Sequence, residues 1–384
     1  MQSFLASLSG IAAALSPRRF PYARFGLALA LGWCGGYAFA TLRLPLPWML
    51  GSMTVLTVAS LLRLPVAAPA LIRPPMTAII GVMLGSSFRP DVVAQVGTWL
   101  PTVLGLAAFV SVSALACIVY LHKVAGFDRA TAYFAGMPGG LVEMIELGEQ
   151  RGADHNAIAL AHSARVLMIV LTLPFLVQWI EGVSLGNRSQ LGTSLAAASW
   201  SGLELLVVCG IVGVIVGRRL NLPGPFLLGP MLASAAVHVS GLTDFVPPRE
   251  IVNTAQLILG TVLGCRFAGT APATILRVLR IAVGSTAILL AVTMSFAYIL
   301  GHATGYGMVP IMLAYSPGGL AEMSLVALAI HTDVAFVAAH HIVRIVLVMV
   351  SAGPVFALMD RIVGPERVVR PPGPDPKPIE EPAE

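Results

Sequence analysis

Two copies of one short segment interrupt otherwise apolar stretches of this chain. The first copy reads PGGLVEM over residues 138–144, and the second reads PGGLAEM over 317–323, an offset of 179 residues (317 − 138). Pro-Gly-Gly breaks a helix, because Pro has no backbone N–H and Gly gains little from helical order. Broken backbone at membrane depth persists only where protein or a water-filled cavity satisfies its polar groups. Paired breaks in two halves of a chain are typical of a transporter's binding site.

Composition indicates that these breaks lie in a membrane protein. Of the 384 residues, 57% are hydrophobic and 11% are charged, and the mean hydropathy is +0.86. Soluble domains average about 25% charged residues. The four cysteines lie apart in apolar segments without a Cys-x-x-Cys pair, so neither a disulfide framework nor a thiolate metal site is implied. We therefore expect an all-α polytopic membrane protein.

A membrane-spanning helix needs about 20 apolar residues, and ten stretches approach this length. In the first half they are 22–41, 44–62, 70–88, 98–121 and 154–180, and in the second half 197–217, 223–240, 252–270, 277–301 and 332–360. A Pro-Gly-Gly segment, 130–148 or 308–328, lies between the fourth and fifth span of each half.

These spans divide the chain into two membrane repeats, 22–180 and 197–360, joined by a linker over 181–196. Residues 1–21 are expected to form an interfacial segment: residues 1–15 are apolar, and Arg18, Arg19 and Arg24 follow them rather than precede them, which is the reverse of a secretory signal. Residues 361–384 are rich in Pro, Glu and Lys, so we expect a disordered cytoplasmic tail.

The two repeats match well beyond the breaks. LPLPWMLGSM over 44–53 aligns with LPGPFLLGPM over 222–231. Three ionisable residues also recur at an offset of 179: Asp154 with Asp333, His162 with His341, and Arg165 with Arg344. Such identities across apolar sequence indicate an internal duplication.

Charge placement predicts how the repeats are oriented. If each Pro-Gly-Gly segment is re-entrant and returns to its own side, each repeat has five spans and the two repeats are inverted. Most Arg and Lys residues then fall on the cytoplasmic side, whereas a six-span repeat would move five arginines outside. We expect inverted repeats in the cytoplasmic (inner) membrane, with both termini in the cytoplasm.

The fifth span of each repeat carries its ionisable residues at depth. His162 and Arg165 share one helix face and lie roughly 12 and 16 Å beyond Asp154, near the middle of a ~30 Å core. A helix that begins after Gly-Gly points free N–H groups and its positive dipole end into the break, which attracts an anion. The expected solute-binding residues are Pro138, Gly139, Gly140, Arg165, Pro317, Gly318, Gly319 and Arg344; the expected ion- or proton-coupling residues are Glu143, Asp154, His162, Glu322, Asp333 and His341.

Structural roles compete with these functional ones. Glu143 and Glu322 could satisfy the helix start themselves, and the arginines could pair with a protein carboxylate instead of a solute. Asp154 and Asp333 stand where helix N-caps are expected. His162 and His341 could be proton carriers or hydrogen-bonded interior histidines.

Together the Leu-Pro-x-Pro…Leu-Gly-x-Met blocks, the twin Pro-Gly-Gly-Leu-x-Glu-Met segments and the closing His341-Ile342-Val343-Arg344 resemble the membrane AbrB-type family over about residues 22–360. Sequences of this family carry an AbrB duplication, and many are also labelled ammonia monooxygenase. The resemblance implies a genetic role in regulating gene expression, distinct from the soluble AbrB transcription factor. More loosely, the architecture is similar to that of citrate-type carboxylate–sodium symporters.

These observations predict a secondary transporter of a small anionic solute, with carboxylates among the candidates, working by alternating access and coupled to H⁺ or Na⁺. No nucleotide-binding motif is present. We expect the lipid bilayer as partner, no cofactor, no metal, no nucleic acid and no enzymatic activity; a homodimer is left open. A membrane regulator acting indirectly on gene expression is the alternative. A copper monooxygenase is a weaker one, because the eight histidines are dispersed and only His340 and His341 adjoin.

Overall fold

The computed structural model describes residues 20–88, 90, 92–182 and 193–364, and every regular element in these ranges is a helix. Residues 1–19 of the expected interfacial segment, 183–192 of the linker and 365–384 of the expected tail lie outside the described residues. The all-helical fold class predicted from the sequence is confirmed for the described part of the chain.

The helices of the two repeats follow one another in the same order. The first repeat consists of α2 (Tyr22–Thr41), α3 (Pro47–Leu61), η1 (Ala70–Ile72), α4 (Arg73–Gly85), α5 (Val92–Gln95), η2 (Val96–Trp99), α6 (Leu100–Lys123), α7 (Arg129–Gly136), α8 (Leu141–Glu149) and α9 (His155–Glu181). The linker ends in η3 (Leu195–Ala197), and the second repeat consists of α11 (Trp200–Arg219), α12 (Pro225–Val239), α13 (Arg249–Gly264), η4 (Cys265–Phe267), α14 (Pro272–Thr304), α15 (Met308–Tyr315), α16 (Leu320–Ala329) and α17 (Val334–Val363).

Backbone geometry agrees with the duplication at a detail that the sequence alone does not show. The residue before α3, Leu46, has a left-handed backbone with φ 41°. Its counterpart before α12, Gly224, is left-handed with φ 63°. A proline follows each of them as the first helical residue, a position where its missing N–H costs nothing. A left-handed Leu is uncommon, so its presence at the position of Gly224 shows that the same turn is built twice.

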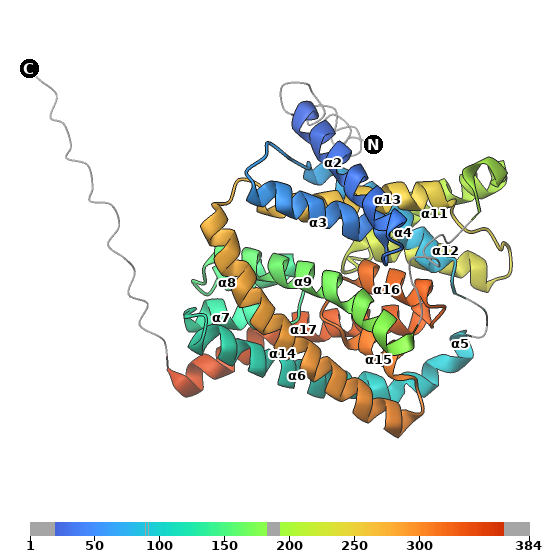
Figure 1. Cartoon of the computed structure of the whole chain (residues 1–384). Helices are drawn as coiled ribbons and strands as arrows, with labels where there is room; N and C mark the ends of the chain where they lie inside the picture. The colour runs from blue at the N-terminus through green and yellow to red at the C-terminus, as the bar shows by residue number, and fades with distance from the viewer. Residues whose placement is uncertain (1–19, 89, 91, 183–192, 365–384) are drawn as a thin grey trace, which may run out of the picture.

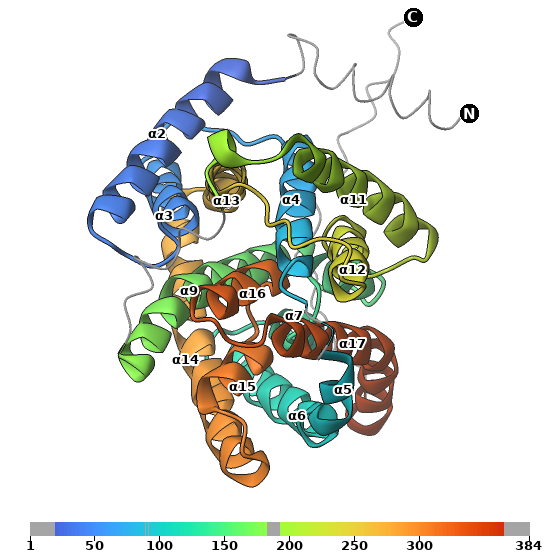
Figure 2. The same ribbon diagram turned by 90° about the vertical axis from the view of Figure 1, so that its right-hand side faces the viewer.

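The helices form two groups that lie side by side in both views (Figures 1 and 2). One group holds α2, α3 and α4 with α11, α12 and α13. The other holds α6 to α9 with α14 to α17, and it therefore contains both breaks. Helices α9 and α16 lie at the boundary, against α13 and α4 of the first group.

Glycines let the helices of the first group approach closely, and they do so reciprocally between repeats. Gly81 and Gly85 of α4 lie against the backbone of α12. Gly260 and Gly264 of α13 lie against the backbone of α3 in the same way. A side chain at any of these positions would overlap with the neighbouring helix, which agrees with the small-residue packing typical of membrane helices. Each repeat thus completes the packing of the other.

Only part of the predicted set of ten spans has full length. Five helices of the described residues are long and apolar enough to cross a membrane: Val96–Lys123, His155–Glu181, Trp200–Arg219, Pro272–Thr304 and Val334–Ile362. Helices α3 and α12 have 15 residues each, or about 22 Å, which is less than a ~30 Å hydrocarbon core. Tight turns end these two helices early. The turn after α3 contains Arg63, which has a left-handed backbone conformation. The chain is therefore membrane-type, while the orientation of its repeats stays a prediction.

Candidate functional site

Each Pro-Gly-Gly segment separates two short helices. Helix α7 ends at Gly136 and α8 begins at Leu141, with extended backbone at Met137 between them. Helix α15 ends at Tyr315 and α16 begins at Leu320, with extended backbone at Ser316. The glycines of both segments keep negative φ angles, so the chain does not need them for a left-handed turn.

Arg165 lies on α9 with 4% of its surface exposed, and its side chain reaches the end of α7. Its Nη1 donates to the carbonyl oxygens of Ala135 at 3.2 Å and Gly136 at 3.4 Å, and its Nη2 donates to that of Met137 at 3.1 Å. The last carbonyls of a helix lack intrahelical partners and carry the negative end of the helix dipole. The guanidinium therefore caps the broken helix.

Arg344 makes a similar arrangement in the second repeat. It is also 4% exposed. Its Nη1 donates to the carbonyl oxygens of Tyr315, at 3.2 Å, and of Ser316, and its Nη2 donates to that of Gly318 at 3.3 Å. The two cations lie near enough for their charges to repel each other.

Carboxylate partners for these arginines were an open alternative from the sequence, and the structure does not bring them together. The ion pairs within the described ranges are His155–Glu149 and Arg249–Glu250, and both lie outside the site. Main-chain carbonyl oxygens bind the arginines in place of a carboxylate. No sequence pattern predicts these partners.

His162 and His341 are fixed by the same arrangement. Arg165 Nη2 lies 2.7 Å from His162 Nδ1, and Arg344 Nη2 lies 3.0 Å from His341 Nδ1. Because Arg only donates, Nδ1 accepts, and the proton is assigned to Nε2. That Nε2 donates to the carbonyl of Phe134 at 2.9 Å or of Leu313 at 3.0 Å. Both ring nitrogens of each histidine thus form hydrogen bonds, as the hydrogen-bonded interior histidine of the sequence analysis would. A proton-carrying role for His162 and His341 stays a prediction.

Glu143 and Glu322 occupy the third residue of α8 and α16, and both are half-buried. Their carboxylates fold back over Gly140 and Gly319, in the space where a Cβ atom of those residues would be. The second glycine of each segment therefore makes room for the acid. An acid in the first turn also interacts favourably with the positive end of the helix dipole.

Asp154 and Asp333 are helix N-caps. Asp154 Oδ1 accepts from the Ala157 N–H at 3.0 Å, and Asp333 Oδ1 accepts from the Phe336 N–H at 3.0 Å. This is the capping alternative that the sequence left open, and an ion-coupling role for either residue stays untested.

One arginine near the breaks was not singled out from the sequence. Arg266 in η4 donates from Nη1 to Ser163 Oγ at 3.2 Å, and it interacts electrostatically with Glu322. Arg266 belongs to one helix group, whereas Ser163 on α9 and Glu322 on α16 belong to the other. A polar contact thus crosses the boundary beside the second break. Arg266 matches Ser87 of the first repeat at the common offset, and this Arg–Ser difference was the signal available in the sequence.

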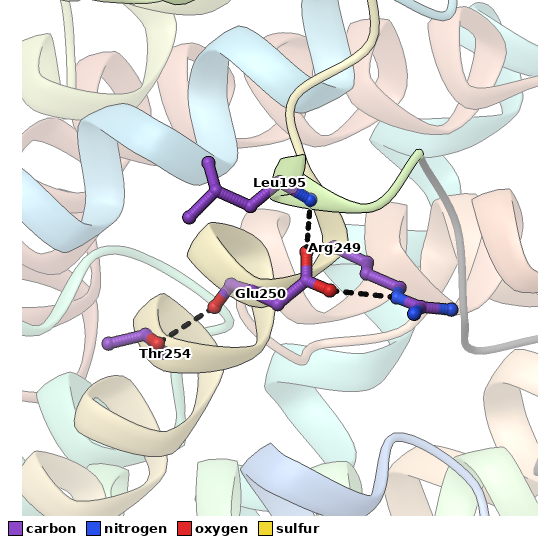
Figure 3. Close-up of polar contacts among 4 residues, drawn as sticks. All are labelled: Leu195, Arg249, Glu250 and Thr254. Atoms are coloured by element: carbon purple, nitrogen blue, oxygen red, sulfur yellow. Dashed lines mark hydrogen bonds and ion pairs between the residues drawn. The ribbon is translucent and has the colours of Figure 1, made fainter. Parts of the chain in front are cut away.

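A second polar contact ties the linker to the second repeat, away from the breaks (Figure 3). Glu250 at the start of α13 accepts from the Leu195 N–H at 2.8 Å and from Arg249 Nε at 3.0 Å. These hydrogen bonds, with that from Arg249 the strongest, hold the pKa of Glu250 below its usual 4.5. The contact is exposed and positions η3 rather than a solute.

In the part of the chain that the structure describes, the histidines, cysteines and acids do not form a set of metal ligands. Within the described residues, no three side chains of His, Cys, Asp or Glu come together in a group that could hold a metal ion. The described residues therefore offer no copper site that would support the monooxygenase hypothesis.

Comparison with known proteins assigns the chain to a family. The family described as transition state regulatory protein AbrB matches residues 48–360, a range that includes both breaks and both arginines. The chain belongs to the AbrB family. This confirms the resemblance seen in the sequence motifs.

Two relatives resemble the chain over nearly its whole length. The uncharacterized protein YhjN of Bacillus subtilis (strain 168) is 25% identical over 368 residues, covering 88% of this chain and 94% of YhjN. A protein of Escherichia coli (strain K12) that carries the name regulator AbrB is 23% identical over 347 residues, covering 90% of this chain and 99% of that protein. The AbrB family is thus established for the chain, while the names describe only those relatives.

Proposed function

We propose that this AbrB-family chain is a secondary transporter that moves a small anionic solute, unchanged, across the inner membrane by alternating access. One observation carries the proposal: a broken helix, capped by a buried arginine, is built twice in one helix group. Structural repeats with paired discontinuous helices are typical of secondary transporters.

The proposed mechanism needs the two repeats to be inverted, with one break entered from each side of the membrane. The reciprocal packing of α3 with α13 and of α4 with α12 supports a two-fold relation between the repeats, which inverted and parallel repeats would both produce; the proposal of inversion rests on charge placement. Charge placement supports the direction, with both termini in the cytoplasm.

The starts of α8 and α16 are the proposed solute contacts. Their first N–H groups lack intrahelical partners and point into the breaks, where an anionic group would be attracted. Glu143 and Glu322 already lie there, so a proton or Na⁺ that neutralises either carboxylate would favour the binding of an anion. We propose these two acids as the coupling groups, with Arg165 and Arg344 holding the breaks in shape.

Reconstituted vesicles test this mechanism. Uptake of labelled carboxylates is measured under a Na⁺ gradient or a pH gradient for wild type, Glu143→Gln and Glu322→Gln. Glu146→Gln is the matched control, because Glu146 lies on α8 one turn further on and is exposed. We expect gradient-driven uptake in wild type and Glu146→Gln, and its loss in the other two variants. Equal uptake in all four proteins would contradict the coupling role.

Regulation of gene expression through the membrane is the second candidate function. It is favoured by the family description and by the name of the E. coli relative. A deletion strain separates the two candidates: if the Glu143→Gln, Glu322→Gln double variant restores its expression phenotype fully, regulation does not need the proposed transport. Failure of that variant, with rescue by Glu146→Gln, would place transport upstream of regulation.

A further inference from the structure

A small cavity lies beside Arg165 at the end of α7, among α6, α9 and α14. Its lining includes Cys117, Gly136, Ala161 and Ser285 along with Arg165 itself. The cavity has a volume of about 10 Å³, which is enough for one water molecule or one ion of similar size.

The corresponding space beside Arg344 is occupied by larger side chains. At the common offset of 179 residues, Tyr315 replaces Gly136 and His340 replaces Ala161. Both are fully buried and both contact Thr102: the Tyr315 hydroxyl donates to its carbonyl, and His340 Nε2 lies 2.9 Å from its Oγ1. Two further lining positions are also enlarged in the second repeat, since Phe296 matches Cys117 and Leu106 matches Ser285.

No described residue forms an ion pair with the guanidinium of Arg165 at the cavity. Arg165 is 4% exposed, and among the described residues its Nη atoms bind only carbonyls and His162 and its Nε has no hydrogen-bond partner. Arg344 Nε is likewise without a partner, so the first repeat differs in the space beside its arginine rather than in the guanidinium. A buried cation without a counter-ion is costly, and the second guanidinium nearby adds repulsion.

We infer that the cavity beside Arg165 binds a monatomic anion of halide size as the counter-ion of this guanidinium. The carbonyl dipoles at the end of α7 hold the guanidinium in place and offset part of its positive charge. The anion neutralises the remaining positive charge of Arg165. This site is separate from the proposed solute contacts at the starts of α8 and α16.

Chloride binding to the purified full chain in detergent tests the inference, with methanesulfonate as the larger anion at equal ionic strength. Ser285→Leu gives the cavity the residue found in the second repeat. Leu106→Ile, a volume-conserving change at the matched position, is the control. We expect saturable binding of radioactive chloride, with one ion per chain, and a chloride-dependent rise in Tm. Ser285→Leu should weaken binding by at least about tenfold, while Leu106→Ile should bind like wild type.

The inference is overturned if wild type shows no saturable chloride binding, or if Ser285→Leu binds chloride as wild type does. Should Ser285→Leu fail to fold, Ala161→Val fills another part of the lining and is judged by the same two outcomes. Because binding is measured without vesicles, its result is independent of whether the solute transport proposed above occurs.

Discussion

At the first break, Arg165 stands beside a cavity that Gly136 and Ala161 leave open; at the second, Tyr315 and His340 fill the matching space beside Arg344. Each arginine donates to three carbonyls of its break, two of them at matched positions, and each has a histidine three residues before it. The comparison separates two kinds of residue within one chain. Both repeats keep the arginine that caps the broken helix, because the fold contains two such breaks. The repeats differ in the residues that leave open or fill the space beside that arginine.

The largest effect should come from removing the caps themselves. Arg344→Ala leaves three carbonyls of the α15 break without a donor, and Arg165→Ala does the same at α7. We expect each change to lower the free energy of unfolding by about 2–5 kcal/mol, since each unsatisfied buried group costs about 1–3 kcal/mol. Arg344→Ala should cost more, because the cavity beside Arg165 can admit water to the freed carbonyls. Thermal unfolding in detergent measures both.

Lysine at these positions provides the control for charge. A Lys cannot reproduce the planar fork that spans successive carbonyls, so Arg165→Lys and Arg344→Lys should recover only part of the loss. If alanine at position 165 left stability unchanged while abolishing transport, Arg165 would be a solute contact, and the parallel with Arg344 would fail.

A smaller effect is expected where glycine makes room for an acid. Gly140→Ala places a methyl group against the Glu143 carboxylate, and Gly319→Ala does so against Glu322. Each should destabilise by about 1 kcal/mol, the lower end for overpacking a site with a movable neighbour. Adding Glu143→Ala or Glu322→Ala should relieve the overlap, with a coupling energy of about 0.5–3 kcal/mol in the double-mutant cycle. Strictly additive effects in one repeat but not in the other would show that only one acid occupies this position in solution.

The smallest effect concerns a contact found in one repeat alone. Glu250 corresponds to Leu71 at the common offset, so the first repeat has no acid there. The hydrogen bond from Arg249 lowers the pKa of Glu250 in the folded chain. Its contribution to stability is therefore present above the usual pKa of 4.5 and is lost as pH falls through the lower folded value. Glu250→Gln should lower Tm slightly at pH 7 and converge with wild type in acid, whereas a difference that persists at low pH would refute the assignment.

Much of this architecture could be predicted from the sequence. Pro-Gly-Gly fixed where the helices break, because its effect on the backbone is local. Asp before a helix start predicted a cap, and His162 and Arg165 at a spacing of three residues predicted one shared face. The family resemblance was confirmed by the match over residues 48–360.

The partners of the buried arginines could not be predicted in the same way. Carbonyl oxygens belong to every residue, so no side-chain pattern marks the ones that receive Arg165 or Arg344. The shortness of α3 and α12 was also hidden, because apolar residues continue into turns whose left-handed residues carry weak sequence signals. Arg266 looked like one more basic residue near a membrane surface, since its contact with Ser163 joins segments 103 residues apart.

The exchange of partners between α3 and α13, and between α4 and α12, bears on how the chain is made. While the ribosome has delivered only the first repeat, the glycine face of α4 has no helix to cover it and α3 lacks one of its neighbours. We therefore do not expect the first repeat alone to form a stable folded intermediate during synthesis. We expect the early helices to stay loosely associated in the membrane until α12 and α13 have been inserted and the two repeats can pack against each other.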